Sequence, residues 1–313
     1  MTALRILIAD GLEENGQSIL REAAGVTDRS GIAAEELRGL LSGYDALIVK
    51  DRTEVSAQVL EAAKGLKVVG KAGASTDNID LEAAKRHGVV VVNAPAAAAS
   101  SVAEFVFGLL LALAREIPRA DASQKSGVEK TDQLQGVELN GKTLGIVGYG
   151  RTGMEVGKRA AAFGMNVVAY DPFVPEEVIR ERGAETASLQ ELFAWSDFIS
   201  LLLPYDVHTR DLIGPLAFSE MKNGVRLVCA AGAGIVDEQA LLAALNSGKV
   251  AGAALDTFQT PLDQPSALVL HPRVIATPRL AAQTAEAGMR AAEDIAREVL
   301  AALRGEPLRW RVA

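Results

Sequence analysis

Three glycines at fixed spacing form the most informative chemical pattern in the chain. Residues 144–153 read Leu-Gly-Ile-Val-Gly-Tyr-Gly-Arg-Thr-Gly, so Gly148, Gly150 and Gly153 follow an apolar run and open a helical pattern. In such a turn the first glycine permits a tight bend, the second lets backbone approach a pyrophosphate, and the third lets the helix pack against the strand. The helix N-terminus then offers backbone amides to the phosphates. The spacing predicts a dinucleotide-binding turn.

An acidic residue follows where such a turn requires one. A second apolar run, residues 166–169, leads to Tyr170 and Asp171. An acid about 20 residues beyond the glycines accepts hydrogen bonds from the adenosine ribose. Its charge would repel a 2′-phosphate, so the predicted cofactor is NAD rather than NADP. The alternative interpretation is a turn retained only for packing.

Basic side chains that could bind an anion follow two other predicted strands. Lys50, Asp51 and Arg52 come directly after one apolar run, and Lys71 comes directly after another. With Arg279 they could form a pocket for a small anion, although charge runs are usually solvated strand ends. Asp51 is either a general acid or base, or a salt-bridge partner of the neighbouring cations.

Metal and disulfide chemistry find little support in the sequence. His87, His208 and His271 have no metal-ligand spacing, so no metal site is predicted. The single cysteine, Cys229, excludes an intrachain disulfide and is expected in a buried strand.

The elements that must position these residues alternate along the chain. Short, almost continuous apolar runs separated by amphipathic stretches predict an α/β fold with parallel sheets covered on both faces. Ser101-Val-Ala-Glu104 matches a capping box and predicts a long helix that reaches about Arg119. A last helix is predicted from about Gln283 to Arg304. The expected strands are Arg5–Ala9, Ala46–Val49, Lys67–Gly70, Val89–Val92, Thr143–Val147, Asn166–Ala169, Phe198–Leu202, Leu227–Ala230 and Ala251–Leu255.

Composition and net charge limit the classes of molecule that the protein is expected to bind. Of 313 residues 49% are hydrophobic, which allows a large core, and the net charge of −8 argues against a nucleic-acid or anionic-membrane surface. The most apolar run, 102–114, is too short to span a bilayer. Met1–Asp10 reads as a strand rather than a secretory leader, so a cytoplasmic location is expected.

The chain resembles the D-isomer-specific 2-hydroxyacid dehydrogenases, most closely their phosphoglycerate dehydrogenase branch. The resemblance covers nearly the whole chain and rests on several stretches besides the glycine turn. These are Leu66–Gly73, Asp77–Asp80, Val92–Pro95, Ser101–Glu104, Leu139–Ile146, Ala169–Pro172, Gly234–Asp237 and Ala253–Asp256.

The resemblance implies two Rossmann-like domains. A flavodoxin-like substrate domain would comprise residues 1–96 plus 284–313, and the NAD-binding Rossmann domain would comprise residues 97–283. The helix after Ser101 would form a homodimer interface.

The resemblance also implies particular roles near the cofactor. Arg151 and Thr152 would give amides to the pyrophosphate, Pro204 and Thr209 would flank the cofactor, and Asp256 would lie near the nicotinamide carboxamide. In the same loop as Pro204, Tyr205, Asp206 and His208 are candidate proton donors, although a plain surface position is the simpler interpretation of His208. Ala74 and Ser75 occupy the substrate loop, where Ser75 stands in place of the family's glycine.

The catalytic trio of the family is not found at the matching positions. Gly232 stands where the family carries an arginine, and Arg279 stands where it carries a histidine. The expected glutamate is absent around Thr260, and the next acid, Asp263, lies beyond a proline. Because a guanidinium stays protonated, Arg279 cannot act as a general acid or base, although it can bind a carboxylate. The sequence therefore predicts a remodelled active site and a candidate pseudoenzyme.

Three functions remain open from the sequence. The first is an oxidoreductase with changed chemistry or weak activity, in which Lys50, Arg52 or Arg279 binds a small anion. The second is a non-catalytic NAD-binding sensor or dimeric scaffold. The third is a non-redox elimination or hydration in the same cleft.

Overall fold

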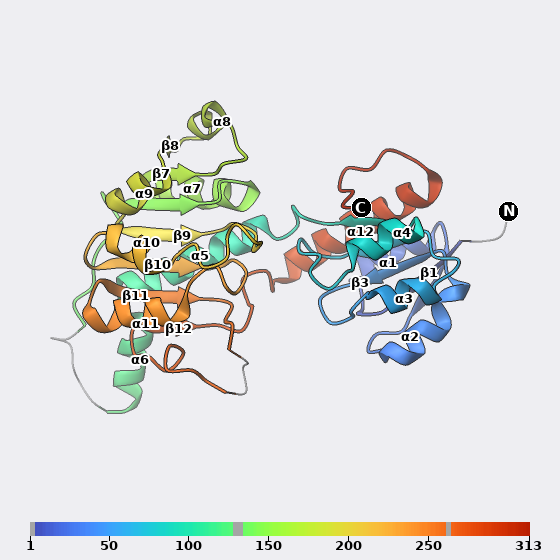
Figure 1. Cartoon of the computed structure of the whole chain (residues 1–313), viewed down its shortest axis with the longest axis horizontal. Helices are drawn as coiled ribbons and strands as arrows, with labels where there is room; N and C mark the ends of the chain where they lie inside the picture. The colour runs from blue at the N-terminus through green and yellow to red at the C-terminus, as the bar shows by residue number, and fades with distance from the viewer. Residues whose placement is uncertain (1–3, 128–133, 261–263) are drawn as a thin grey trace. The chain divides into compact units, whose positions relative to one another are not determined.

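The computed structural model describes residues 4–127, 134–260 and 264–313. It divides the chain into two compact units (Figure 1). Unit 1 comprises Met1–Ala99 with Gln283–Ala313, and unit 2 comprises Ser100–Ala282. Within the described residues, no helix has both the length and the apolar character needed to cross a bilayer.

Unit 1 is built on a five-stranded parallel sheet of order β2-β1-β3-β4-β5. This flavodoxin-like order confirms the fold predicted for the unit. Side chains alternate between its faces: Leu7 joins one apolar cluster, while Ile6 and Ile8 join the other. The strands are β1 (Arg5–Ile8), β2 (Gly25–Asp28), β3 (Ala46–Val49), β4 (Val68–Lys71) and β5 (Val90–Asn93).

Helices cover both faces of this sheet. Helix α12 packs so closely on β4 that a Cβ added to Gly70 would lie 2.5 Å from Val299 Cγ2. The side chain of Thr284 caps its N-terminus, and Gly305 ends it in the left-handed conformation, so it starts two residues later than expected and ends where expected. The helices of unit 1 are α1 (Glu14–Arg21), α2 (Ala34–Leu40), α3 (Ala57–Ala62), α4 (Leu81–His87), α12 (Ala285–Arg304) and the 3-10 helix η1 (Leu41–Gly43).

Unit 2 contains a seven-stranded parallel sheet of order β12-β11-β10-β9-β6-β7-β8. The strand order reverses between β6 and β9, and ligands of such sheets bind at the carboxyl edge beside this switch point. The strands are β6 (Thr143–Val147), β7 (Asn166–Tyr170), β8 (Glu185–Thr186), β9 (Phe198–Leu201), β10 (Val225–Cys229), β11 (Val250–Leu255) and β12 (Val274–Ala276).

The helices of unit 2 include one clear departure from expectation. The predicted capping box is wrong, because α5 already begins at Ala99, so Ser101 lies inside the helix, and Glu104 pairs with Arg159. The helix also ends early, because Glu116 adopts the left-handed conformation with φ 55°. The helices are α5 (Ala99–Ala114), α6 (Ile117–Lys125), α7 (Arg151–Ala162), α8 (Glu176–Glu181), α9 (Leu189–Trp195), α10 (Pro215–Glu220) and α11 (Glu238–Ser247).

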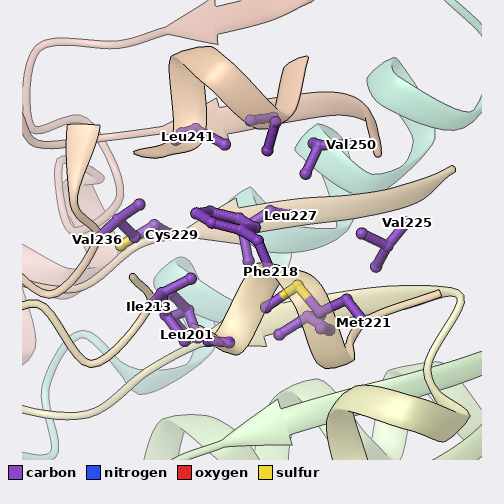
Figure 2. Close-up of a cluster of buried hydrophobic side chains, with 14 of the residues drawn as sticks. Leu201, Ile213, Phe218, Met221, Val225, Leu227, Cys229, Val236, Leu241 and Val250 are labelled. Carbon is purple, nitrogen blue, oxygen red and sulfur yellow. The ribbon is translucent and has the colours of Figure 1, made fainter. Parts of the chain in front are cut away.

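An apolar cluster fixes the strands that carry the candidate site. Figure 2 shows Leu227 and Cys229 of β10 among side chains from the neighbouring helices, including Phe218 and Leu241. Burial raises the pKa of the Cys229 thiol to about 11, so this buried cysteine is a neutral packing residue, as the sequence predicts. The packing holds the carboxyl ends of β9, β10 and β11 in place.

Candidate cofactor and anion site

The glycine turn joins β6 to α7 at the carboxyl edge of the unit 2 sheet. Gly148 has φ +95°, and a Cβ there would lie 2.8 Å from the carbonyl carbon of Leu202, on β9's side of the switch point. A Cβ at Gly153 would lie 2.2 Å from the carbonyl oxygen of Gly148. Both positions therefore require glycine for conformation or for close packing of helix on turn.

Gly150 is a glycine for a different reason. Its φ of −70° suits any residue, and a Cβ added there would meet no atom within 4 Å. The protein itself does not need a glycine here, whereas a ligand that approaches the backbone would. Arg151 and Thr152 form the first turn of α7, whose N-cap residue makes no side-chain hydrogen bond to the helix. Open space beside the amides of a helix N-terminus fits a pyrophosphate.

Asp171 is held beside this turn by backbone amides. Its Oδ2 accepts a hydrogen bond from the Tyr149 N–H at 2.8 Å, and its Oδ1 accepts one from the Phe173 N–H at 2.9 Å. Each carboxylate oxygen can accept a second hydrogen bond. The half-buried carboxylate is thus fixed in direction and has acceptor capacity left for two ribose hydroxyls, so the residues present fit a dinucleotide.

The loop after β9 is shaped by its own polar groups. The Thr209 hydroxyl donates to the Pro204 carbonyl oxygen at 2.9 Å and accepts from the Asp206 N–H at 2.7 Å. Asp206 in turn accepts from the His208 and Thr209 amides, and these bonds lower the pKa of its carboxyl. Asp206 therefore shapes the loop as an ionised carboxylate and is not a proton donor near neutral pH.

Tyr205 covers the glycines that follow β10. A Cβ added to Gly232 would lie 2.7 Å from Tyr205 Cβ, and one added to Gly234 would lie 2.8 Å from Tyr205 Cε2. The place where a side chain at position 232 would begin is thus already taken. From the sequence, Tyr205 is a candidate proton donor, and this contact with the glycines is not predicted. The aromatic Tyr205 lies in one loop and the glycines lie in the loop after the next strand, and only the fold brings the two loops together.

Asp256 organises the loop that carries Arg279. The Asp256 side chain is buried and accepts hydrogen bonds from the Thr277 hydroxyl at 2.7 Å and from the Leu280 and Ala281 amides at 2.8 and 2.9 Å. Its carbonyl oxygen accepts the Arg279 N–H at 2.9 Å. Both carboxylate oxygens are therefore committed to the loop, whatever else Asp256 contacts.

Arg279 itself has unusual backbone geometry. Its φ of 58° lies in the left-handed region, which non-glycine residues rarely adopt and which clusters at functional sites. The side chain is exposed, and no ion pair or hydrogen bond holds its guanidinium within the described ranges. Arg279 is thus a cation held at the end of β12 by the contacts of Asp256.

The segment at Gln259 and Thr260, where a glutamate is expected from the resemblance, is hydrogen-bonded to Glu238. The Gln259 N–H donates to Glu238 Oε1 at 2.6 Å, and the Thr260 hydroxyl donates to Glu238 Oε2 at 3.4 Å. Glu238 therefore anchors this stretch to α11. Asp263 lies outside the described residues.

In unit 1, carboxylates pair with the basic residues after β3. Lys50 Nζ lies 2.8 Å from Glu13 Oε1, and Arg52 Nε lies 3.2 Å from Asp10 Oδ1. Asp10 also accepts the Lys50 and Thr53 amides. Burial alone would raise the pKa of Asp10, but these hydrogen bonds lower it overall. Lys50 and Arg52 are therefore neighbouring cations on one loop, each already neutralised in part.

Lys71 is fully buried at the end of β4. Its Nζ donates to the Lys50 carbonyl oxygen at 2.7 Å, to Asp51 Oδ1 at 2.5 Å and to Asn78 Oδ1 at 2.9 Å. These contacts use all three ammonium hydrogens. Lys71 holds the Lys50–Asp51 turn, which is a positioning role in place of the predicted anion-binding one, and Asp51 is its salt-bridge partner.

The predicted substrate loop follows Lys71. Ala74 and Ser75 are exposed; the Ala74 carbonyl oxygen accepts from Asn93 Nδ2 at 2.8 Å, and Ser75 Oγ accepts the Asp77 N–H at 3.2 Å. No group of three or more metal-ligating side chains occurs in the part of the chain that the structure describes.

Comparison with known proteins places these features in a family. The pattern of the D-isomer specific 2-hydroxyacid dehydrogenase, NAD binding domain, matches residues 107–281, more than half of the chain. The D-3-phosphoglycerate dehydrogenase of Methanocaldococcus jannaschii is 43% identical over 97% of this chain and 58% of that protein. The Rattus norvegicus protein of the same name is 44% identical, over 97% of this chain and 57% of its own length. The chain thus spans less than three fifths of the length of these relatives.

Solved structures are similar over the full length. The TT0316 protein from Thermus thermophilus has a TM-score of 0.88 and 31% identity, with 99% of this chain and 100% of that chain covered. The apo-structure of D-lactate dehydrogenase from Escherichia coli has a TM-score of 0.83 and 28% identity over the same shares of the two chains.

Proposed function

The chain belongs to the D-isomer specific 2-hydroxyacid dehydrogenase family and carries its NAD-binding domain, and we propose that it binds NAD beside a remodelled active site. The proposed protein is an oxidoreductase homologue that acts weakly, or on an atypical small anionic substrate. The observation that carries this proposal is the contrast within unit 2. The glycine turn and Asp171 are arranged for a dinucleotide, whereas Gly232 and Arg279 supply no proton donor for reduction of a keto acid.

The chain's own residues support binding and orientation of a substrate anion better than proton transfer. Bound NADH would supply the hydride. Arg279 would attract a carboxylate or stabilise developing negative charge, because its planar guanidinium is exposed and matches the geometry of a carboxylate. Within unit 1, Lys50 and Arg52 are candidate anion-binding cations, and their pairing with Glu13 and Asp10 reduces the positive charge that they offer. Without a general acid, reduction would be slower by about 10²–10⁴-fold.

Calorimetric titration with NADH and NADPH tests the cofactor half of the proposal. We expect NADH to bind and NADPH to bind much more weakly, because Asp171 would repel a 2′-phosphate. Gly150→Ala should weaken NADH binding without lowering the melting temperature, because its added methyl meets only ligand space. Gly39→Ala is a matched control: it also adds a methyl in open space, but on α2 of unit 1. Equal NADH affinity in parent and Gly150→Ala would contradict the proposed site.

Initial rates with glyoxylate and hydroxypyruvate test the catalytic half. We expect NADH oxidation far below the rates of family members that carry the full trio, and a further decrease in Arg279→Ala. Turnover at ordinary family rates would refute the remodelled site. Tight NADH binding without any turnover would instead favour the second candidate function, a non-catalytic NAD-binding sensor. The lack of a proton donor at position 279 favours this candidate.

We also propose that the protein is a cytoplasmic homodimer joined through α5. Phe105 and Leu111 of this helix remain partly exposed although the helix is apolar on nearly every side. Phe107 stacks on Phe163 with ring centroids 5.1 Å apart, and Phe163 is 44% exposed. An apolar surface of this kind favours a protein partner. Sedimentation equilibrium should give a dimer, and Leu111→Glu should shift it toward monomer; a monomeric parent would exclude this interface.

A further inference from the structure

The loop after β9 carries donor groups that the protein itself does not use. Arg210 Nε donates to the Tyr205 hydroxyl oxygen at 3.1 Å. This bond occupies the phenol oxygen as an acceptor and leaves the Tyr205 O–H hydrogen available. Within the described residues, neither that hydrogen nor the two terminal nitrogens of Arg210 has a hydrogen-bond partner, although the charge of Asp211 acts on the guanidinium. The hydrogen bond to Tyr205 raises the pKa of Arg210, so its charge is permanent.

Packing fixes the position of Tyr205. Its Cβ lies over Gly232 and its ring lies over Gly234, each so close that a side chain there would force Tyr205 or the backbone to shift. Gln259 Nε2 flanks the same glycine, 3.1 Å from where a Cβ at Gly234 would be. The tyrosine therefore rests on backbone, and 42% of its surface stays open to solvent. An aromatic side chain has only two rotatable angles, so this contact fixes the position of the phenol oxygen, while its O–H hydrogen can rotate toward a ligand.

The backbone beside Arg210 is pinned as well. Asp211 adopts φ 50°, in the left-handed region, and its N–H donates to the Gly234 carbonyl oxygen at 2.8 Å. Ile213 then pairs with Ile235 through another backbone hydrogen bond of 3.0 Å. Strained backbone persists where surrounding contacts enforce it and concentrates at ligand sites. These contacts hold Arg210 and Tyr205 at the carboxyl edge of the sheet, where ligands of this architecture bind.

We propose that Tyr205 and Arg210 together bind the carboxylate of the small anion at this site, a task that no side chain at position 232 can perform. The two terminal guanidinium nitrogens match the two oxygens of a planar carboxylate, and the phenol adds a third donor from the side. The inference rests on the proposed function, because it assigns the residues that recognise the anion beside the cofactor. Both are assigned direct binding of the anion; neither is assigned the transfer of a proton.

Oxalate, an unreactive planar dicarboxylate, provides the test. It is titrated calorimetrically into the NADH-bound protein and into the variants Tyr205→Phe and Arg210→Gln. We expect oxalate affinity to fall about tenfold or more in Arg210→Gln and several-fold in Tyr205→Phe, with NADH affinity unchanged. Arg86→Gln is the matched control: it removes an arginine that is also exposed, from the last turn of α4, and oxalate affinity should not change.

The outcomes separate this inference from the proposed function. If NADH binds but oxalate does not, or if Arg210→Gln binds oxalate as the parent does, the Tyr205–Arg210 assignment is wrong while the cofactor site stands. If NADH does not bind at all, the proposed function fails first, and oxalate titration of the cofactor-free protein still tests the pair. Inorganic phosphate binding more tightly than oxalate, with the same dependence on Arg210, would overturn the carboxylate assignment. Thermal melts of each variant identify any loss that is due to unfolding.

Discussion

Gly232→Ala is the substitution for which the structure and the sequence make opposite predictions. Gly232 does not adopt the left-handed conformation, so the backbone accepts alanine. From the chain alone, glycine to alanine at such a position should stabilise the protein by about 0.4–1 kcal/mol, because the unfolded state loses freedom. In the structure the new Cβ would lie 2.7 Å from Tyr205 Cβ, which is closer than real Cβ atoms approach.

The expected magnitude follows from that contact. Overpacking typically costs about 1–3 kcal/mol, because side chains and backbone must shift. After the unfolded-state gain is subtracted, we expect a net loss of roughly 1–2 kcal/mol. For a unit of this size, that corresponds to a decrease of about 2–8 °C in melting temperature. Thermal and urea denaturation of Gly232→Ala and parent would measure it.

Two variants of Tyr205 test whether its Cβ is the atom that clashes with a new side chain at position 232. Tyr205→Ala keeps Cβ, so Gly232→Ala should still destabilise in that background. Tyr205→Gly removes Cβ, so Gly232→Ala should become neutral or stabilising there. A parent-background melting temperature that is unchanged or raised would refute the reasoning, as would the same loss in both Tyr205 backgrounds. The same contact means that Gly232→Arg alone will not restore the family's arginine, because Tyr205 occupies the start of its path.

Three further predictions follow from other parts of the molecule. Hydrogen bonds lower the pKa of Asp10 despite its burial, so its contribution to stability is present above the unfolded-state pKa of 3.8 and is lost as pH falls through the folded-state pKa. Urea denaturation from neutral to acid pH should therefore show a smaller acid-induced loss of unfolding free energy in Asp10→Asn than in the parent. Equal slopes of unfolding free energy against pH would contradict this. Because burial raises the pKa of Cys229 to about 11, iodoacetamide at neutral pH should label it no faster than the protein unfolds, and rapid labelling of folded protein would show that the thiol is accessible. Asp256→Asn leaves at least one donor of the 277–281 loop without its carboxylate acceptor, so we expect a destabilisation of about 1–3 kcal/mol and faster amide exchange at Leu280 and Ala281; unchanged protection there would exclude the positioning role of Asp256.

The proposed cofactor turn can be recognised in the sequence because its determinants are local. Gly148, Gly150 and Gly153 act through the conformation of one turn, and Asp171 follows the very next strand. The alternation of apolar runs and helices likewise predicts both parallel sheets, because each element buries its own face. Even so, local reasoning erred at Ser101, since the helix there begins earlier and Glu104 pairs across to α7.

The proposed anion site depends on tertiary structure. Nothing near Lys71 in the chain reveals that its ammonium is buried and saturated by Asp51 and Asn78. Nothing beside Gly232 reveals that Tyr205, from the preceding strand's loop, fills the space in front of it. The sequence by itself determined which groups the protein owns and where its turns lie. Which of those groups remain available to a ligand depends on contacts between loops distant in the chain, and only the folded sheet brings those loops together.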